Sequence, residues 1–356
     1  MNHKQTLDRI TAKYSDTNNA DYLLDDLLQF TAEVSKEVNE KKSPPIPLAK
    51  AAKNYLHRVL NTNEADAISS GFDKFDNDLG GFLPGELIIF GGRPGMGKTS
   101  LFLHFALEMA KNNKHVLYIS LDASIDILSI RLLTKLSGVP HHKIRLGDLS
   151  DTEQAKLEQC IADIEHKSIY IDDMPSHIFS IKEKCRQLKE EGKLDVLMVD
   201  YLQMVGGSSR RNSNRELEIA MICKELKNIA KEFNVCVLAA SGLSRAVESR
   251  GGDKRPQLSD LRESGAIEQE ADKVVFLYRP AYYNINEDEN GNSLANLMEL
   301  IVAKNRSGAL INSVFKTNDD LSSFEELETI LADVSQQEVY IVYADKLKKH
   351  ISSLSL

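Results

Sequence analysis

The segment LIIFGGRPGMGKTSL, at residues 87–101, constrains this chain more than any other. A glycine-rich turn joins a short apolar run to the start of an amphipathic helix, and its spacing matches the pattern G-x-x-x-x-G-K-[ST]. In such a turn, backbone N–H groups wrap a phosphate at a helix N-terminus, where the helix dipole favours negative charge. A chance glycine-rich turn is the alternative. The strand before the turn and the helix after it favour phosphate binding, so the sequence predicts an ATP site.

The residues of this phosphate-binding loop have separate expected roles. Gly95 and Gly97 permit backbone angles that other residues disfavour. Lys98 would reach the β- and γ-phosphates as a point charge, and the Thr99 hydroxyl would bind Mg²⁺. The predicted nucleotide-binding residues are consecutive: Gly92, Arg93, Pro94, Gly95, Met96, Gly97, Lys98, Thr99 and Ser100.

Size and composition limit the kind of protein. At 356 residues, the chain suits one large domain with appendages. Its four cysteines lack C-x-x-C spacing, which argues against a thiolate metal site and a secreted disulfide framework. No apolar run approaches membrane-spanning length, and the N-terminus MNHKQTLDRI has no signal-peptide core. We therefore expect a cytoplasmic protein with no membrane contact.

Positive charge gathers in two segments of an otherwise acidic chain. The formal net charge of −9 argues against a protein that coats nucleic acid over its whole surface. Residues 204–215, however, carry Arg210, Arg211 and Arg215 and no acidic residue. Residues 245–262 carry five basic and three acidic residues in a long polar stretch. Such long loops are usually functional or disordered, so we expect contacts with a nucleic-acid backbone, with a solvated charged loop as the alternative.

Short apolar runs alternate with helical stretches through the centre of the chain. The runs occupy residues 87–90, 115–121, 168–171, 195–200, 234–240, 273–278 and 297–303. Near-continuous Val, Ile and Leu runs between helices indicate parallel strands that are covered on both faces. The sequence thus predicts an α/β fold with a mainly parallel central sheet flanked by helices. Ligands of such sheets bind at the carboxyl ends of the strands.

The two ends of the chain differ from this centre. Residues 1–43 are acidic and helical in pattern, and residues 44–67 combine the linker KKSPPIP with an amphipathic helix that begins at Pro47. The apolar stripe of that helix must dock on the main domain or on a neighbouring subunit. After Phe315 the pattern weakens. We therefore expect an ATPase domain at residues 68–317 and a helical or strand-helix tail at residues 318–356.

Two carboxylates follow predicted strands near the phosphate-binding loop. Asp200 ends the run DVLMVD, where it can hold Mg²⁺ opposite the loop. Asp122 follows the next strand after the loop, where it can orient and deprotonate an attacking water. Either could instead be an ordinary strand-end carboxylate. Together with the loop, they predict a metal ligand at Asp200 and a general base at Asp122.

A pair of cations follows the last predicted strand. Lys304 and Arg306, in IVAKNRSG, occupy alternate positions and can point the same way. Cations that reach the γ-phosphate of a nucleotide in an adjacent subunit contribute about 10³- to 10⁵-fold in rate. Taken without other information, an exposed pair at a strand end is the favoured interpretation.

Five motifs in order resemble the C-terminal motor domain of DnaB-type replicative helicases, from about Ile68 to Thr317. They are ISSGFDKFDNDLGGFLPGELIIFGGRPGMGKT, VLYISLD, VLMVDYLQMV, KRPQLSDLRESGAIEQEADKVVFLYR and AKNRSG. The resemblance implies a RecA-like P-loop ATPase that assembles as a ring hexamer and binds single-stranded DNA in its centre. It also implies translocation driven by ATP hydrolysis, DNA replication as the setting, and a primase or helicase loader as a partner.

The resemblance also implies roles for individual residues. The catalytic residues would be Asp122, in the place of the family's glutamate, Lys98, and the pair Lys304 and Arg306 donated to the neighbour's nucleotide. Thr99 and Asp200 would bind the metal. Arg262, Glu263 and Gly265 match a loop that holds the DNA backbone, to which the charge pattern adds Arg210 and Arg211. The helix at residues 47–60 resembles the linker helix that packs on an adjacent protomer.

The sequence departs from the family pattern at three places. Asp122 is one carbon shorter than the usual glutamate, roughly 1.5 Å of reach. Gly242 stands where the family has a glutamine that links the γ-phosphate to the DNA loop. Residues 1–43 are too few for the family's usual N-terminal collar domain. These departures suit a divergent member of the family from a phage or mobile element, or a paralogue. A nucleotide-dependent DNA-binding or assembly factor with weak hydrolysis is therefore the alternative to a helicase, whereas LRESGAIEQEAD disfavours a recombinase.

Overall fold

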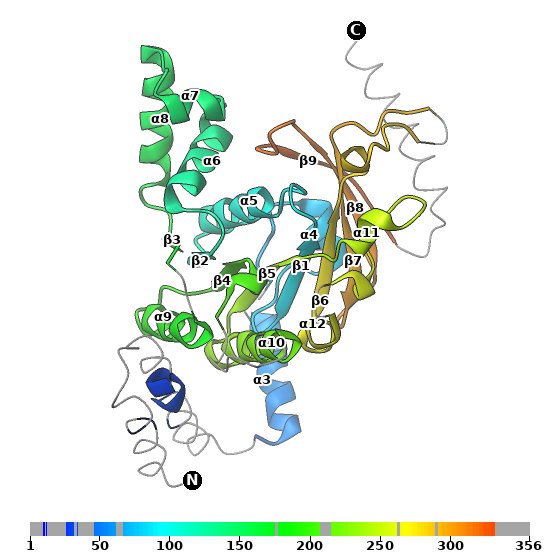
Figure 1. Ribbon diagram of the computed structural model, residues 1–356. Helices are drawn as coiled ribbons and strands as arrows, with labels where there is room; N and C mark the ends of the chain where they lie inside the picture. The colour runs from blue at the N-terminus through cyan, green and yellow to red at the C-terminus, as the bar shows by residue number, and fades with distance from the viewer. Residues whose placement is uncertain are drawn as a thin grey trace.

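The protein is built around one nine-stranded sheet. A computed structural model describes residues 10, 12, 26–31, 34, 46–61, 67–174, 177–206, 215–261, 264–288 and 291–331. The strand order is β3-β2-β4-β5-β1-β6-β7-β8-β9, and helices cover both faces of the sheet (Figure 1).

Six strands form the parallel part of the sheet. They are β1 (Leu87–Gly92), β2 (Val116–Ser120), β3 (Ile169–Asp172), β4 (Val196–Asp200), β5 (Cys236–Gly242) and β6 (Lys273–Tyr278). Every neighbouring pair among them is parallel, and β1, β2, β4 and β6 are buried at every position. Strands buried on both faces carry continuous apolar runs, which is why the sequence predicted these four strands and β5, buried at all but its last position, correctly. The predicted strand β3 is also present, although it is half-buried along its length.

The remaining three strands extend the sheet in the antiparallel sense. They are β7 (Leu297–Asn305), β8 (Ile311–Thr317) and β9 (Phe324–Leu331). The expectation of a parallel strand at residues 297–303 was wrong, because the described part of the β6–β7 link holds only a short 3₁₀ turn, η3 (Pro280–Tyr283), and no crossover helix. The sheet also continues past residue 317. Its last strand, FEELETIL, is a charged edge strand, so it lacks the apolar run that marks a buried strand.

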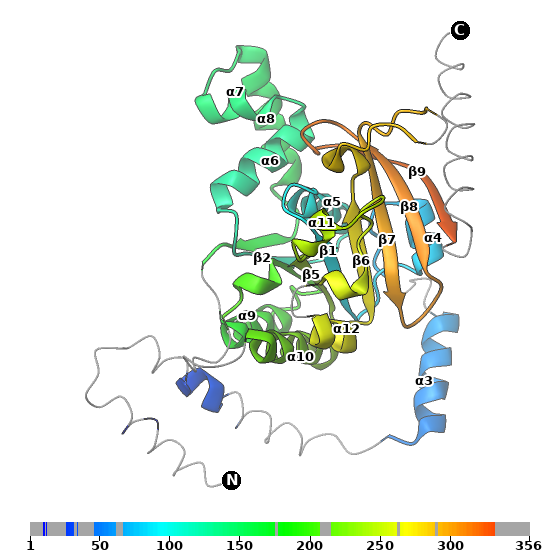
Figure 2. The ribbon, with the colours of Figure 1, turned by 45° about the vertical axis from the view of Figure 1, so that its right-hand side comes forward.

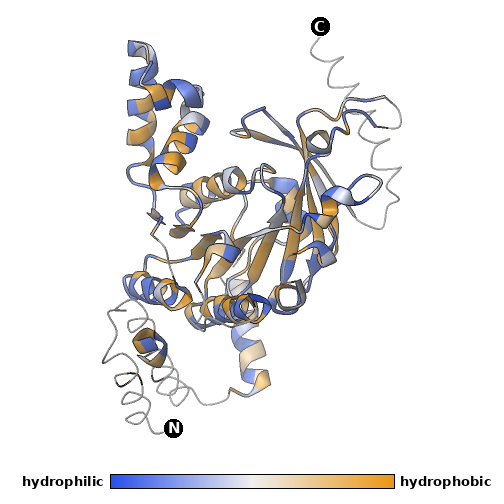
Figure 3. Cartoon of the chain, viewed as in Figure 1, coloured by the Kyte–Doolittle hydropathy of each residue, from blue (hydrophilic) through white to orange (hydrophobic). Residues whose placement is uncertain are grey.

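The helices belong to two layers and one projecting group. Their bounds are α3 (Leu48–Asn61), α4 (Asp73–Leu79), α5 (Lys98–Lys111), α6 (Ile125–Ser137), α7 (His141–Leu146), α8 (Asp151–Ile164), α9 (Ile178–Glu190), α10 (Arg215–Phe233), α11 (Ala246–Ser249) and α12 (Ser264–Glu270). Residues of α4 and α5 pack with Ile88 and Phe90 in one core cluster. Residues of α9, α10 and α12 pack with Leu87 and Ile89 in the other. Alternate residues of β1 therefore anchor opposite faces of the sheet, and the apolar colouring follows the strands (Figure 3).

The projecting group is α6, α7 and α8, which lies between β2 and β3 in the chain and rises above the edge of the sheet (Figure 1). Local signals set its boundaries. The Ser124 side chain caps α6, a capping box between Ser150 and Glu153 starts α8, and Gly138 ends α6 in the left-handed conformation.

Helix α3 stands apart from the sheet (Figure 2). Its predicted apolar stripe is exposed, with Leu48 at 85 %, Tyr55 at 60 % and Leu56 at 57 % of the residue's full accessible surface. The stripe therefore does not dock on the main domain of its own chain. None of the helices in the described ranges is both long and apolar enough to traverse a lipid bilayer.

Candidate nucleotide-binding site

The phosphate-binding loop leaves the carboxyl end of β1 and enters α5. Gly95 and Gly97 have φ values of +79° and +94°, the left-handed region that the sequence led us to expect of them. Gly97 is also close to the turn between β8 and β9, because a Cβ at this position would lie 2.9 Å from Leu321 Cδ1. Both glycines are therefore required by backbone geometry.

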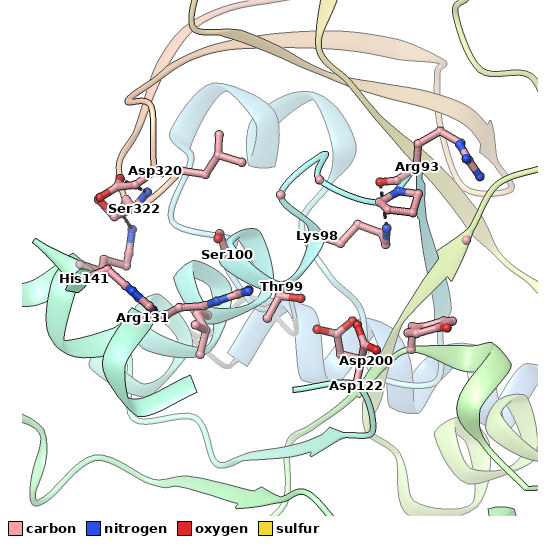
Figure 4. Close-up of a pocket in the computed structure, with 18 of the residues that line it drawn as sticks. Arg93, Lys98, Thr99, Ser100, Asp122, Arg131, His141, Asp200, Asp320 and Ser322 are labelled. Carbon is pink, nitrogen blue, oxygen red and sulfur yellow. Dashed lines mark hydrogen bonds between the residues drawn. The ribbon is translucent and has the colours of Figure 1, made fainter. Parts of the chain in front are cut away.

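A cavity of about 740 Å³ opens at this loop (Figure 4). The loop residues form one wall, and Asp122 and Asp200 form a second at the ends of neighbouring strands. Helix α6 contributes Arg131 and Lys135, and the β8–β9 turn contributes residues 320–322. The cavity thus lies at the carboxyl edge of the parallel strands, as the sequence predicted for a ligand site.

Lys98 is held at the mouth of the loop. Its Nζ donates hydrogen bonds to the carbonyl oxygens of Gly92, at 2.8 Å, and Arg93, at 3.2 Å. Burial lowers the pKa of Lys98, while the negative charges of Asp200 and Asp122 oppose that shift. A phosphate entering the cavity would meet a partly desolvated ammonium, where charge interactions are stronger than in water.

Asp200 and Thr99, the two predicted metal ligands, are brought together. Asp200 is 3 % exposed and accepts hydrogen bonds from Thr99 and from Tyr118 Oη, the latter at 3.0 Å. Burial raises the pKa of Asp200, and these two hydrogen bonds and Lys98 oppose the rise. A hydroxyl and a carboxylate suit Mg²⁺, which keeps several waters and phosphate oxygens as its other ligands. No group of three or more His, Cys, Asp or Glu side chains that could hold a metal ion by itself occurs among the described residues.

Asp122 lies beside Asp200 in the same cavity (Figure 4). It belongs to the short link between β2 and α6, which is fixed by a hydrogen bond from Ser120 Oγ to the Ala123 carbonyl oxygen at 2.5 Å. The predicted general base therefore lies next to the predicted metal ligand, opposite Lys98.

Lys304 and Arg306 lie at the other edge of the sheet. Because β7 runs antiparallel to β6, its C-terminal end adjoins Lys273 at the start of β6. Both cations point the same way, as predicted, toward carbonyl oxygens near the end of α12 and the link that follows it: Lys304 Nζ donates to Glu268 and Ala271, and Arg306 to Gln269. The six residues of β1 separate this edge from the cavity by roughly 17 Å. The two cations therefore cannot complete the cavity of their own chain.

Comparison with known proteins places this geometry in a family. The family model described as DnaB-like helicase C terminal domain matches residues 67–326. The chain belongs to this family. The resemblance noted in the five motifs and the RecA-like fold that it implied are thereby confirmed.

Individual relatives support the family assignment. The chain is 38 % identical over 299 residues to the replicative DNA helicase DnaB of Geobacillus stearothermophilus, covering 83 % of this chain and 64 % of the relative. It is 42 % identical over 243 residues to the replicative DNA helicase DnaC of Bacillus subtilis, covering 68 % and 52 %. The chain thus spans less than two thirds of the length of these two curated relatives.

Two solved structures share the fold. One of them, an ATPase domain, superposes with a TM-score of 0.73 at 32 % identity, covering 80 % of this chain and all of that one. A DnaB-like replicative helicase, whose structure was described together with its interactions with primase, also gives 0.73 at 30 % identity, covering 92 % and 76 %.

The side chain of Arg93, a residue of the phosphate-binding loop, makes hydrogen bonds within the domain. Its guanidinium donates to Glu248, at 2.8 Å, and to the Leu243 carbonyl oxygen, at 2.8 Å. The side chain is 10 % exposed. The predicted nucleotide contact of Arg93 is therefore left to its main chain, while the side chain ties the loop to the segment after β5.

Sequence reasoning did not predict that two cations of α6 and the β8–β9 turn would line the cavity. Lys135 Nζ donates to the Ser322 carbonyl oxygen at 2.8 Å and lies 5.2 Å from the centre of the Phe324 ring. Burial lowers the pKa of Lys135 to about 8. Arg131 lies one turn earlier on the same helix and points into the cavity (Figure 4). No motif marks these residues, because they reach the cavity only through the packing of segments almost 200 residues apart.

The predicted DNA-binding residues are described only in part. Gly265 lies in the first turn of α12 and is exposed. Arg210, Arg211, Arg262 and Glu263 lie outside the described residues.

Three basic residues of the segment 245–261 make contacts within the domain or line its cavity. Arg250 pairs with Asp260, and Arg255 pairs with Glu299 at 2.7 Å, while Arg245 lines the cavity. These three side chains face the domain's own carboxylates and cavity, because the segment packs along the carboxyl edge of β6. The expected contact of this segment with a nucleic-acid backbone stays a prediction.

Proposed function

We propose that this chain is the motor of an ATP-dependent DNA helicase of the ring-forming DnaB-like class. It would couple ATP hydrolysis to translocation along single-stranded DNA during DNA replication. The observation that supports this most strongly is the division of a hydrolytic site between opposite edges of one sheet. Lys98, Thr99, Asp122 and Asp200 lie at the carboxyl edge, whereas Lys304 and Arg306 lie at the amino edge. A second copy must supply the missing cations.

The chemistry is hydrolysis of the bond between the β- and γ-phosphates of ATP. Asp122 accepts a proton from the attacking water, whose oxygen bonds to the γ-phosphorus as the bond to the bridging oxygen breaks. Lys98 holds the charge that develops on the phosphates. Thr99 and Asp200 would hold Mg²⁺, which supplies further positive charge when bound. Arg306 of a neighbour adds positive charge at the γ-phosphate.

We propose assembly as a homo-hexamer, with single-stranded DNA as the partner in its centre. The exposed stripe of α3 suits docking on an adjacent protomer, since exposed apolar patches mark interaction sites. Contact with a primase or a helicase loader is a further proposal, in keeping with the primase interactions described for one of the neighbouring structures.

A nucleotide-dependent DNA-binding or assembly factor is the second candidate. Two observations favour it: the shorter carboxylate of Asp122, and the absence of a side chain at Gly242 on the cavity wall. Such a protein would bind ATP and DNA but hydrolyse ATP slowly. Lys98, Asp200, Lys304 and Arg306 favour the motor, because a protein that only binds nucleotide has little use for all four.

ATP turnover with and without single-stranded DNA separates the two candidates. Lys98→Ala serves as the blank, and Asp122→Glu combined with Gly242→Gln serves as the restored form. We expect DNA-stimulated turnover in the parent, at a level below that of the restored form. Parent turnover no higher than the blank would eliminate the motor and leave the binding factor.

A further inference from the structure

The turn between β8 and β9, residues 318–323, forms one wall of the nucleotide cavity. Leu321 is buried, although residues 318–320 before it and residue 323 after it are exposed. Its side chain reaches the phosphate-binding loop, because a Cβ built on Gly97 would lie 2.9 Å from Leu321 Cδ1. The turn therefore places an apolar side chain against Gly97, the residue from which α5 starts.

Leu321 has a backbone conformation that leucine rarely adopts. Its φ is +57°, in the left-handed region that favours glycine. Such a conformation persists where the surrounding contacts impose it. Within the turn, the Leu321 N–H donates to the Asn318 carbonyl oxygen at 3.1 Å, and the Ser323 N–H donates to Asn318 Oδ1 at 3.0 Å. These two hydrogen bonds shape the turn, but they do not attach it to the rest of the cavity.

Lys135 of α6 attaches the turn to the opposite wall. Its Nζ donates to the Ser322 carbonyl oxygen at 2.8 Å, which joins positions 187 residues apart in the chain. The same Nζ lies 5.2 Å from the ring centre of Phe324, the first residue of β9. The pKa of Lys135, about 8, leaves the ammonium charged at pH 7. A charge-assisted hydrogen bond and a cation–π contact therefore meet at one atom.

This contact brings two walls of the cavity together. Helix α6 lines the cavity with residues 131, 134 and 135, and the turn lines it with residues 320–322 (Figure 4). Ser322, which Lys135 holds, directly follows Leu321, which contacts Gly97. The Lys135 ammonium therefore sets how closely the turn approaches both α6 and the phosphate-binding loop.

We propose that Lys135 is a positioning residue that holds the β8–β9 turn against the phosphate-binding loop and so slows the release of bound nucleotide. The inference rests on the proposed function, in which the cavity holds ATP. The ammonium fixes Ser322, and Ser322 keeps the strained Leu321 on Gly97. When the ammonium is lost, the turn moves away from the loop and this wall of the cavity opens. Affinity differences among variants of one site arise mainly in the release rate, so nucleotide should leave faster but enter at a similar rate.

The test compares Lys135→Met, which keeps a long unbranched side chain without the charge or the donor, with Lys156→Met as the matched control. Lys156 is exposed on α8. Each protein is loaded with methylanthraniloyl-labelled β,γ-imido-ATP and Mg²⁺, and the release rate is followed by stopped-flow fluorescence after excess ATP is added. This analogue resists hydrolysis, so the assay reports release alone. We expect Lys135→Met to raise the release rate about 5-fold, the net contribution of one hydrogen bond, and the control to match the parent.

Two further variants separate positioning from a general loss of structure. Lys135→Arg can still donate to the Ser322 carbonyl oxygen and lie over the Phe324 ring, so it should release nucleotide at close to the parent rate. Leu321→Gly suits the positive φ and removes the side chain at Gly97, so it tests the same contact if Lys135→Met does not fold. It should also accelerate release about 5-fold. Combining Leu321→Gly with Lys135→Met should add little, because both changes free the same turn.

Release from Lys135→Met at the parent rate would overturn the proposal. Faster release from Lys135→Met together with unchanged release from Leu321→Gly would overturn it as well, because Lys135 would then act on the nucleotide directly and not through the turn. A parent that does not bind the labelled analogue would instead contradict the proposed function itself.

Discussion

The two edges of the central sheet hold their cations in different surroundings. At the carboxyl edge, Lys98 lies in a cavity beside Asp122 and Asp200, and burial lowers its pKa. At the amino edge, the Arg306 side chain is 49 % exposed and contacts the Gln269 carbonyl oxygen and the Asp272 carboxylate of its own chain. The first edge forms a complete phosphate cradle. The second presents positive charge away from the cavity of its own chain, which is the contrast that supports the proposed sharing of a site between chains.

The amino edge is also built so that Arg306 can leave its present contacts. Asp272 is firmly held by Lys227, at 2.5 Å, and by the Leu87 N–H, at 2.8 Å. Its contact with Arg306 is longer, at 3.4 Å. Exposed ion pairs contribute little, so a nucleotide phosphate can displace this one. Asp272 keeps its two other partners when that happens.

The largest expected effect comes from the amino edge. Arg306→Ala should reduce ATP turnover by about 10³- to 10⁵-fold, as for other cations donated to a γ-phosphate. Nucleotide affinity should change much less, because the cradle at the other edge remains. Turnover and binding of a fluorescent ATP analogue measure the two properties, with Arg145→Ala on exposed α7 as the control. An equal loss of nucleotide binding and of turnover in Arg306→Ala would contradict the separate roles assigned to the two edges.

A smaller loss is expected at the carboxyl edge, with a different signature. Lys98→Ala should lower turnover by about 10²- to 10³-fold, the usual consequence of removing one preorganised group that stabilises developing charge. Nucleotide affinity should fall as well, since Lys98 faces the phosphates in the ground state. Lys156→Ala, at an exposed position on α8, is the control. Retention of full affinity in Lys98→Ala would contradict the placement of the phosphates at this loop.

Restoring the two unusual positions should raise turnover modestly. Asp122→Glu extends the base toward the attacking water, and Gly242→Gln fills open space on the cavity wall. We expect up to about a 10-fold rise in DNA-stimulated turnover for the pair. Asp126→Glu and Gly251→Gln make the same chemical changes at exposed positions and should have no effect. A fall in turnover would mean that the parent is already adapted to its shorter base.

The smallest expected effect is on the pH dependence of folding stability, through His104 on α5, the helix that carries Lys98 and Thr99. Burial, helped by the charges of Lys135 and Lys111, lowers the pKa of His104 on α5 from 6.5 to about 3. The unfolded chain therefore binds a proton that the folded chain does not, so stability is lost as pH falls from about 6.5 toward about 3. The slope from this group is at most about 1.4 kcal/mol per pH unit.

Urea denaturation between pH 4 and pH 7.5 measures this contribution. His104→Phe keeps a ring against Phe72, whose ring lies 4.3 Å from that of His104, and should flatten the acid side of the stability curve. His166→Phe, at an exposed position, should not. Identical curves for His104→Phe and the parent would show that α5 is less buried than the structure indicates.

The sequence predicted the carboxyl edge better than the amino edge, for physical reasons. Gly97, Lys98 and Thr99 are neighbours in one motif. The buried strands β4, which ends at Asp200, and β2, which ends just before Asp122, have uniform apolar runs. The fold class and the contents of the cradle follow from these local patterns. The resemblance supplied the role of Lys304 and Arg306, whereas their separation from the cavity depends on the antiparallel direction of β7.

Two other features, the position of Lys135 in the cavity and the strand β9, could not be predicted from local sequence patterns. Lys135 reaches the cavity through an amphipathic helix, and β9 is a charged edge strand, so neither leaves a distinctive signal. The charge pattern of the basic segment 245–261 suggested a nucleic-acid surface, but it gave no sign of the ion pairs that Arg250 and Arg255 form inside the domain. Charge in a sequence does not reveal which cations already have partners.

Mixing two inactive variants tests the division of the site most directly. Lys98→Ala and Arg306→Ala are assembled together in equal amounts, and ATP turnover is compared with each variant alone. In a ring, roughly a quarter of the interfaces then join an intact Lys98 to an intact Arg306. Turnover should recover to about that fraction of the parent's. If the mixture is no more active than the separate variants, although they assemble together, Arg306 does not complete the nucleotide site of a neighbouring chain.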